Sequence, residues 1–118
     1  MNTPWGKSQT VKKIDTGIYF VTTAGHGGYM ISRKKAEKFL PANCINRGFL
    51  GSPYGGYYCY EEDCAYAVLE SFMLSKSIGL YKYIESLIQE KNMSMNEYYA
   101  NLQKTIASYY PDVLKVTV

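Results

Sequence analysis

The sequence has few of the features that mark a membrane or exported protein. None of its apolar runs approaches the roughly 20 residues that a membrane-spanning helix needs. The first residues, MNTPWGKSQT, lack the apolar stretch of a signal peptide. We therefore expect a cytoplasmic protein with no membrane partner.

Cysteine and histidine are scarce, which limits metal and cofactor chemistry. The cysteines are Cys44, Cys59 and Cys64, and the one histidine is His26. An odd number of cysteines favours separate, reduced thiols over a disulfide framework. Cys59 and Cys64 are spaced more widely than the ligands of a compact zinc knuckle. We expect three free thiols, no metal site and no cofactor.

Apolar and aromatic residues are abundant. The chain has 118 residues, 47% of them hydrophobic, and 13 tyrosines. This length and composition predict a single domain over residues 1–118 with a real core. Because a buried phenol needs a polar partner, so many tyrosines exceed the needs of one small core. We expect a surface that meets a protein partner or a second copy of the chain to hold several of these six: Tyr54, Tyr57, Tyr58, Tyr98, Tyr109 and Tyr110.

Positive charge is concentrated in the first half. Residues 1–56 carry 8 basic and 2 acidic side chains, whereas residues 57–118 carry 5 basic and 8 acidic ones. A short basic cluster is formed by Arg33, Lys34, Lys35 and Lys38. A solvated helix face explains it better than phosphate contact does, although phosphate contact stays open.

The residue pattern predicts an α+β fold, in which an N-terminal antiparallel sheet of three to five strands packs against three C-terminal helices. Residues 1–60 read as strand and loop with one short helix, residues 61–110 as helical, and residues 113–118 as a terminal strand. The strongest strand is Ile18–Thr23, because its residues are β-branched or aromatic. The apolar spacing predicts these buried residues: Tyr19 or Phe20, Val21, Val68, Leu69, Phe72, Ile84, Leu87, Leu102 and Ile106.

Local signals place several element ends. Ser32 is expected to cap a helix from Arg33 to Leu40, and Pro41 to end it. Ser94 and Glu97 form a capping box for the third C-terminal helix. Residues 41–57 are rich in glycine, proline and asparagine and predict a long loop.

One candidate site is a glycine-rich turn. The single histidine, His26, is flanked by Gly25, Gly27 and Gly28, which allow close backbone approach or a sharp bend. No Lys-Ser or Lys-Thr follows the glycines, so the segment is not a P-loop. A structural hydrogen bond from the histidine is the simpler interpretation, and a functional one stays open.

The other candidate site is the acidic run Glu61, Glu62 and Asp63. Acidic residues at the start of a helix are explained by the helix dipole alone. A carboxylate turned toward His26 would orient the imidazole for general acid–base work. We therefore predict a hydrogen bond or ion pair between His26 and at least one of these carboxylates, covered by Trp5 or Tyr60.

Four short segments together resemble an uncharacterised domain family of phages, plasmids and other bacterial mobile elements. They are Thr3–Gly6 (TPWG), Thr23–Gly28 (TAGHGG), Leu40-Pro41 and Tyr60–Cys64 (YEEDC). The resemblance spans residues 3–75 and implies a context and a set of positions, not an activity. Small proteins of mobile elements often bind and inhibit host defence machines, as anti-CRISPR proteins do.

Three functions are therefore open. The first is a non-enzymatic protein that binds and inhibits a bacterial defence complex, a protein or ribonucleoprotein of the host. The second is a small hydrolase or nucleic-acid-processing enzyme that uses His26 with Glu61, Glu62 or Asp63. The third is a nucleic-acid-binding module that uses basic residues, including Lys12 and Lys13, with tyrosines for stacking. The candidate binding residues are Trp5, Gly25, Gly27, Gly28, Arg33, Lys34, Lys35, Lys38, Tyr54, Tyr57, Tyr58 and Tyr60.

Overall fold

The computed structural model describes residues 1–114 and is built on a five-stranded antiparallel sheet. The strand order is β3-β4-β5-β7-β6, and every neighbouring pair is antiparallel. The strands are β3 (Thr10–Asp15), β4 (Ile18–Thr22), β5 (Gly27–Ser32), β6 (Ser52–Tyr54) and β7 (Tyr57–Glu61). A separate small hairpin pairs β1 (Asn2–Thr3) with β2 (Gly6–Lys7).

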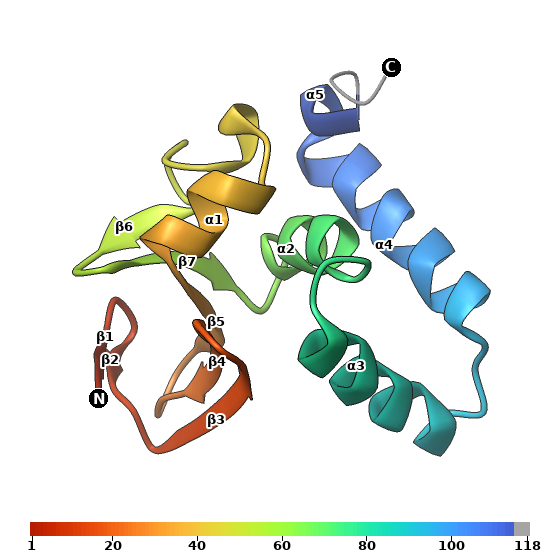
Figure 1. Ribbon diagram of the computed structural model, residues 1–118, viewed down its shortest axis with the longest axis horizontal. Coiled ribbons are helices and arrows are strands. Elements are labelled where there is room, and N and C mark those ends of the chain that lie inside the picture. Colours follow the sequence, from red (N-terminus) through yellow and green to blue (C-terminus); the bar gives the residue numbers. More distant parts are fainter. Residues whose placement is uncertain (115–118) are drawn as a thin grey trace.

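Helices cover one side of the sheet. A short helix α1 (Arg33–Phe39) and a 3₁₀ turn η1 (Ala42–Cys44) lie between β5 and β6 in sequence. The later helices are α2 (Tyr66–Met73), α3 (Ile78–Glu90), α4 (Met95–Tyr109) and the short α5 (Pro111–Leu114). Figure 1 shows α2, α3 and α4 grouped on the side of the molecule away from the β1–β2 hairpin. The predicted α+β architecture is therefore confirmed in outline, with one short helix added at the end.

Alternation along the strands divides the sheet into two faces. Ile18, Tyr29, Ile31 and Tyr60 belong to the main core with the helices. The intervening residues Val21, Met30 and Cys59 form a second cluster on the opposite face, against which Trp5 packs. This pattern follows from the two-residue period of a strand. The sheet thus has a buried helix-facing side and a smaller apolar side near the β1–β2 hairpin.

Most of the predicted core is confirmed. Val21, Val68, Leu69, Ile84, Leu102 and Ile106 are buried. The other predicted core residues are only half-buried: Tyr19, Phe20, Phe72 and Leu87. A half-buried Phe72 lowers the expected cost of a Phe72→Ala change below the roughly 3–5 kcal/mol of a fully buried phenylalanine.

The predicted caps are present. The Ser32 hydroxyl accepts from Lys35 N at the start of α1, and the Ser94 hydroxyl accepts from Glu97 N at the start of α4. The Glu97 carboxylate itself accepts from the Ser94 hydroxyl at 3.0 Å instead of reaching the cap amide. The sequence therefore predicted the capping residues, but the Glu97 carboxylate bonds the Ser94 hydroxyl in place of the predicted Ser94 amide.

Three segment predictions need correction. Residues 41–57, predicted as a long loop, contain η1 and the strand β6, which pairs with β7. Helix α2 begins at Tyr66, five positions after Glu61, because Glu61 ends β7 and residues 62–65 form turns. In the predicted terminal strand, Val113 and Leu114 belong to α5, since Pro111 starts a new helical turn. The rest of that prediction, residues 115–118, lies outside the described residues. No helix within residues 1–114 is long and apolar enough to cross a membrane.

Candidate functional site

The motif segments meet at one end of the sheet. Gly28 on β5 pairs with Val21 on one side and Glu61 on the other. A Cβ at Gly28 would lie 2.3 Å from the Tyr60 carbonyl oxygen and 3.0 Å from Cη2 of Trp5. The absence of a side chain therefore lets β5, β7 and the Trp5 ring approach closely. This packing is a structural reason for glycine beside the tryptophan and the acidic run.

The turn that carries His26 is held by its backbone. The Thr23 backbone N–H and hydroxyl each donate to the His26 carbonyl oxygen at 2.7 Å, and the His26 N–H donates to the Thr23 hydroxyl at 3.1 Å. His26 is exposed, and in the described part of the chain its imidazole ring makes no hydrogen bond or ion pair. The turn thus presents the ring to solvent.

The acidic run is built around Glu61. Its carboxylate accepts the backbone N–H groups of Asp63, Cys64 and Ala65 at 2.8, 2.8 and 3.0 Å. Partial burial works against its charge, but these bonds and the Cys64 thiol outweigh it and lower the pKa of Glu61 below its usual range. Glu61 therefore closes the turn that leads into α2, whereas Glu62 and Asp63 are exposed.

The predicted pairing of His26 with a carboxylate is not observed. Over residues 1–114 no hydrogen bond or ion pair joins the His26 ring to Glu61, Glu62 or Asp63; the one ion pair there is Arg47–Asp112. Glu61 is committed to backbone amides, and the hydrogen bonds of the His26 turn are made by the His26 backbone and not by its ring. The structure therefore does not contain the acid–base pair that the catalytic hypothesis needs.

The same residues nevertheless border one hollow in the surface. The aromatic hollow, as we call it, has a volume of about 360 Å³ and is lined by Trp5, His26, Phe49, Glu61, Asp63, Cys64 and Tyr110. An adjoining hollow shares Trp5, Phe49 and Glu61. Trp5 lines this hollow with His26, Glu61 and Asp63, although the pair that it was predicted to cover is not formed. Tyr60 is buried on the other side of β7 and does not line the hollow.

Phe49 is an exposed aromatic residue of the aromatic hollow, and sequence reasoning did not select it. It is 84% exposed at the tip of a tight turn, in which Arg47 and Leu50 exchange backbone hydrogen bonds of 2.9 and 3.0 Å. Arg47 anchors that turn by donating to the Asn43 carbonyl at 2.9 Å and by pairing with Asp112 at 2.5 Å. The ring is therefore exposed on an ordered support.

The three thiols are protonated. Burial raises the pKa of Cys44 and of Cys59 to about 12. In the aromatic hollow, burial and the Glu61 carboxylate raise the pKa of Cys64, whose thiol donates to Glu61 Oε1 at 2.9 Å. No three His, Cys, Asp or Glu side chains gather to hold a metal ion within the described residues.

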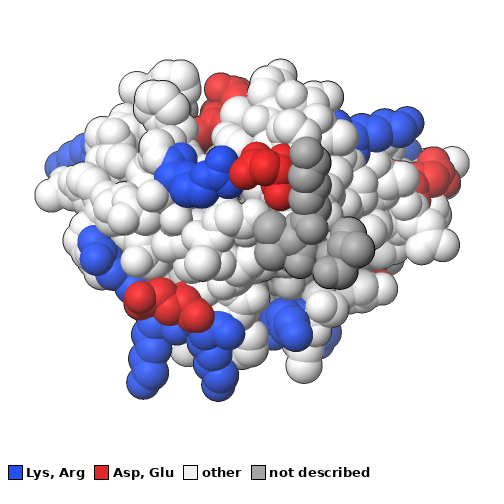
Figure 2. Space-filling view, turned by 90° about the horizontal axis from the view of Figure 1, so that it is seen from above, with Lys and Arg blue, Asp and Glu red and all other residues white. Residues whose placement is uncertain are grey.

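The basic cluster is dispersed. Arg33, Lys34 and Lys38 are exposed, whereas Lys35 is half-buried and donates to the Thr16 carbonyl at 2.7 Å. Arg33 lies over the Tyr58 ring, 5.3 Å from its centroid. On the face shown in Figure 2, several basic side chains gather at the lower left around an acidic group, and another basic group near the centre lies beside an acidic one.

Only some of the selected tyrosines are exposed. Tyr54 and Tyr109 are exposed, and Tyr57, Tyr98 and Tyr110 are half-buried. Two of the candidate binding residues are buried: Tyr58, beneath Arg33, and Tyr60, whose hydroxyl donates to the Cys44 carbonyl at 2.8 Å. Alternation along β7 places both on the helix-facing side.

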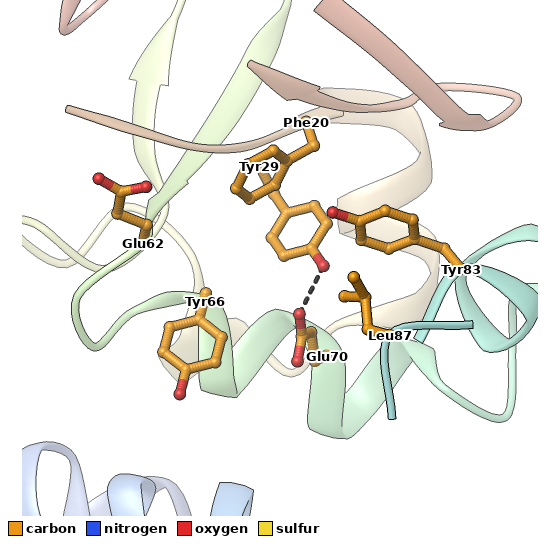
Figure 3. A pocket seen from close by; sticks show the side chains of 7 residues that line it. All are labelled: Phe20, Tyr29, Glu62, Tyr66, Glu70, Tyr83 and Leu87. Carbon is orange, nitrogen blue, oxygen red and sulfur yellow. Dashed lines mark hydrogen bonds between the residues drawn. The ribbon is translucent and has the colours of Figure 1, made fainter. Parts of the chain in front are cut away.

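The structure also reveals a polar cluster that sequence analysis missed. Glu70 on α2 is 3% exposed, and its two oxygens accept hydrogen bonds of 2.5 Å from the hydroxyls of Tyr29 and Tyr98. Burial raises the pKa of Glu70 although both hydrogen bonds favour its charged form. Figure 3 shows this carboxylate at a second, smaller cavity lined by aromatic rings. The local sequence does not single it out, because an acid between the apolar positions of an amphipathic helix is ordinary.

Comparison with known proteins places the chain in a family. Residues 1–117 match the model of DUF7007, described as a domain of unknown function, so the chain belongs to that family. No curated protein and no solved structure matches it.

Proposed function

We propose that this member of the DUF7007 family is a stoichiometric binding protein without catalytic activity, which inhibits a bacterial defence complex in the cytoplasm of the host. The observation that carries the proposal is the exposure of Phe49 on an ordered turn. An exposed phenylalanine forgoes about 1.5–3 kcal/mol of burial free energy. A partner that covers the ring would recover it.

The surroundings of Phe49 fit a protein interface. Trp5 and Tyr110 line the same aromatic hollow, and aromatic side chains dominate the centres of protein–protein interfaces. The ordered turn under Phe49 also limits the conformational entropy lost on binding. These features favour a preformed docking surface.

The charge of the aromatic hollow suggests the chemistry of its partner. Glu61 and Asp63 line it beside the aromatic rings, and no lysine or arginine of residues 1–114 does. Defence complexes that hold guide RNA or target DNA carry lysine- and arginine-rich grooves. An acidic and aromatic surface is complementary to such a groove. The choice of a defence complex, as opposed to another basic partner, rests on the resemblance of the motif segments to mobile-element proteins.

The other two functions have less support. The catalytic hypothesis needs a carboxylate bound to the His26 ring, and that contact is not observed. Glu61 is instead engaged by three backbone amides. The nucleic-acid hypothesis loses Tyr58 to the core and finds Lys35 bound to a carbonyl. We therefore place both behind the binding function.

The test combines binding with inhibition. Purified defence effectors are titrated with the wild-type chain, with Phe49→Ala and with the control Ile78→Ala, whose side chain is 76% exposed on α3 outside the aromatic hollow. We expect the wild type and Ile78→Ala to abolish target cleavage at about one chain per complex. Phe49→Ala should bind at least tenfold more weakly with an unchanged melting temperature.

Two results would contradict the proposal. Inhibition at a small fraction of one chain per complex, lost in His26→Ala, would support the enzyme instead. Equal binding by Phe49→Ala and wild type would remove the aromatic hollow as the docking surface.

A further inference from the structure

The cavity beside Glu70 has a composition unlike that of an ordinary core void. Its volume is about 160 Å³, and it is separate from the aromatic hollow. Four aromatic rings, two carboxylates and one leucine line it: Phe20, Tyr29, Glu62, Tyr66, Glu70, Tyr83 and Leu87. Among residues 1–114, the charged side chains at its wall are both acids.

Glu70 is held in place at this cavity. The phenols of Tyr29 on β5 and Tyr98 on α4 each donate one 2.5 Å hydrogen bond to a different carboxylate oxygen. A carboxylate has about four acceptor positions, so each oxygen keeps one free. In the described part of the chain no cationic side chain pairs with Glu70. A buried carboxylate without a counter-ion is costly, and a cation bound in the cavity would offset that cost.

The rings around the cavity add a second attraction for cations. In Figure 3 the Tyr29 hydroxyl points at the Glu70 carboxylate and Leu87 lies beside that carboxylate. The Phe20 ring lies beyond Tyr29, and the Tyr83 hydroxyl points toward Tyr29. Phe20 packs edge-on against Tyr29, with ring centroids 5.0 Å apart. The electron-rich face of an aromatic ring attracts ammonium groups, and several rings together form cages for them. Tyr83 already shows this behaviour, because the Lys12 ammonium lies 4.7 Å from its ring centroid.

We propose that this cavity binds an alkylammonium group, with Glu70 as its counter-ion and the rings of Phe20, Tyr29 and Tyr83 as its cage. A cavity of about 150 Å³ accommodates a benzene molecule. The cavity here is thus large enough for a trimethylammonium group or for the end of a lysine side chain. The site is independent of the docking surface proposed above.

The test uses simple ammonium probes on the full chain. Tetramethylammonium and n-butylammonium are titrated while the NMR signals of the Leu87 methyl groups and the Tyr83 ring are followed. Tert-butanol serves as an uncharged probe of similar size. We expect saturable shifts with both cations and none with the alcohol.

Matched variants assign the binding to the charge. Glu70→Gln keeps the shape of the side chain and should weaken cation binding at least tenfold. Glu85→Gln, which removes an exposed carboxylate from α3, should leave it unchanged. If Glu70→Gln does not fold, Tyr83→Leu tests the cage instead and should weaken cation binding. Its control is Tyr81→Leu, at an exposed position, which should leave cation binding unchanged.

A third probe, N-acetyl-lysine methylamide, distinguishes a lysine side chain of a protein from a small-molecule amine as the ligand. Binding of this compound as tight as that of n-butylammonium indicates a lysine side chain of a protein. Binding of the free amines alone indicates a small-molecule ligand, and either result supports the site. Equal response to the alcohol, absence of saturation, or unchanged affinity in both Glu70→Gln and Tyr83→Leu would overturn it.

Discussion

The Tyr29 hydroxyl donates a 2.5 Å hydrogen bond to Oε2 of Glu70, although the two residues are 41 positions apart in the sequence. The bond joins the central strand β5 to helix α2. The other oxygen of Glu70 accepts from Tyr98, which adds α4 to the same carboxylate. One buried side chain therefore ties the sheet to two helices, and its protonation state bears on the stability of the fold.

Tyr29→Phe should destabilise the protein by about 1.5–3 kcal/mol, because it removes one of two donors to a buried charged group. Urea unfolding followed by circular dichroism measures this loss. Tyr81→Phe is the control, since Tyr81 is exposed and should change stability by less than about 0.5 kcal/mol. Equal stability of both variants would mean that the Tyr29–Glu70 bond contributes nothing net.

Glu70 should also make stability depend on pH. Burial raises its pKa in the folded state above the ordinary value of 4.5, so the folded state binds the proton more tightly than the unfolded state. Stability that comes from Glu70 is therefore fully present below pH 4.5 and is lost as the pH rises through the raised pKa.

Glu70→Gln removes this titration. We expect the unfolding free energy of the wild type, relative to Glu70→Gln, to fall as the pH rises from 4 toward neutrality. Glu85→Gln, at an exposed position, should show no such trend. A constant difference between wild type and Glu70→Gln across this range would show that the pKa of Glu70 is not raised.

Asp15 should have the opposite pH dependence. The Ser77 hydroxyl donates to its Oδ2 at 2.5 Å, and this bond is the largest cause that lowers the pKa of Asp15 below 3.8. The stability it contributes is present above pH 3.8 and is lost as the pH falls through the lowered pKa. Asp15→Asn should cost about 1.5 kcal/mol at pH 7 and less near pH 2. The control is Asp63→Asn, which removes an exposed carboxyl group and whose unfolding free energy is measured over the same pH range.

Glycine at position 28 should be required for the packing of the motif segments. In Gly28→Ala the new Cβ would meet the Tyr60 carbonyl oxygen at 2.3 Å, so the backbone must shift. Overpacking of this kind costs about 1–3 kcal/mol. Gly25→Ala is a matched control three positions before Gly28, because nothing lies within 4 Å of its added Cβ. The melting temperatures of the two variants are compared by thermal unfolding. A Gly28→Ala variant as stable as the wild type would show that the strands can move apart without loss of stability.

Local chemistry is readable from the sequence alone. The strand at Ile18–Thr22, the caps at Ser32 and Ser94, and the buried stripes of the later helices depend on near neighbours in the chain. Side-chain period, cap hydrogen bonds and apolar spacing act over a few residues, so they leave a pattern in the sequence.

Contacts between distant segments were decided by the tertiary structure. The sequence brought out His26 and the acidic run as special, but the turn at Thr23 directs the ring to solvent and the amides after Glu61 take its carboxylate. Phe49 and Glu70 carry the proposed sites, yet neither differs in sequence from an ordinary loop aromatic or helix acid. Exposure and burial depend on what packs around a residue, and that is set by strand register and helix docking, which no local pattern encodes.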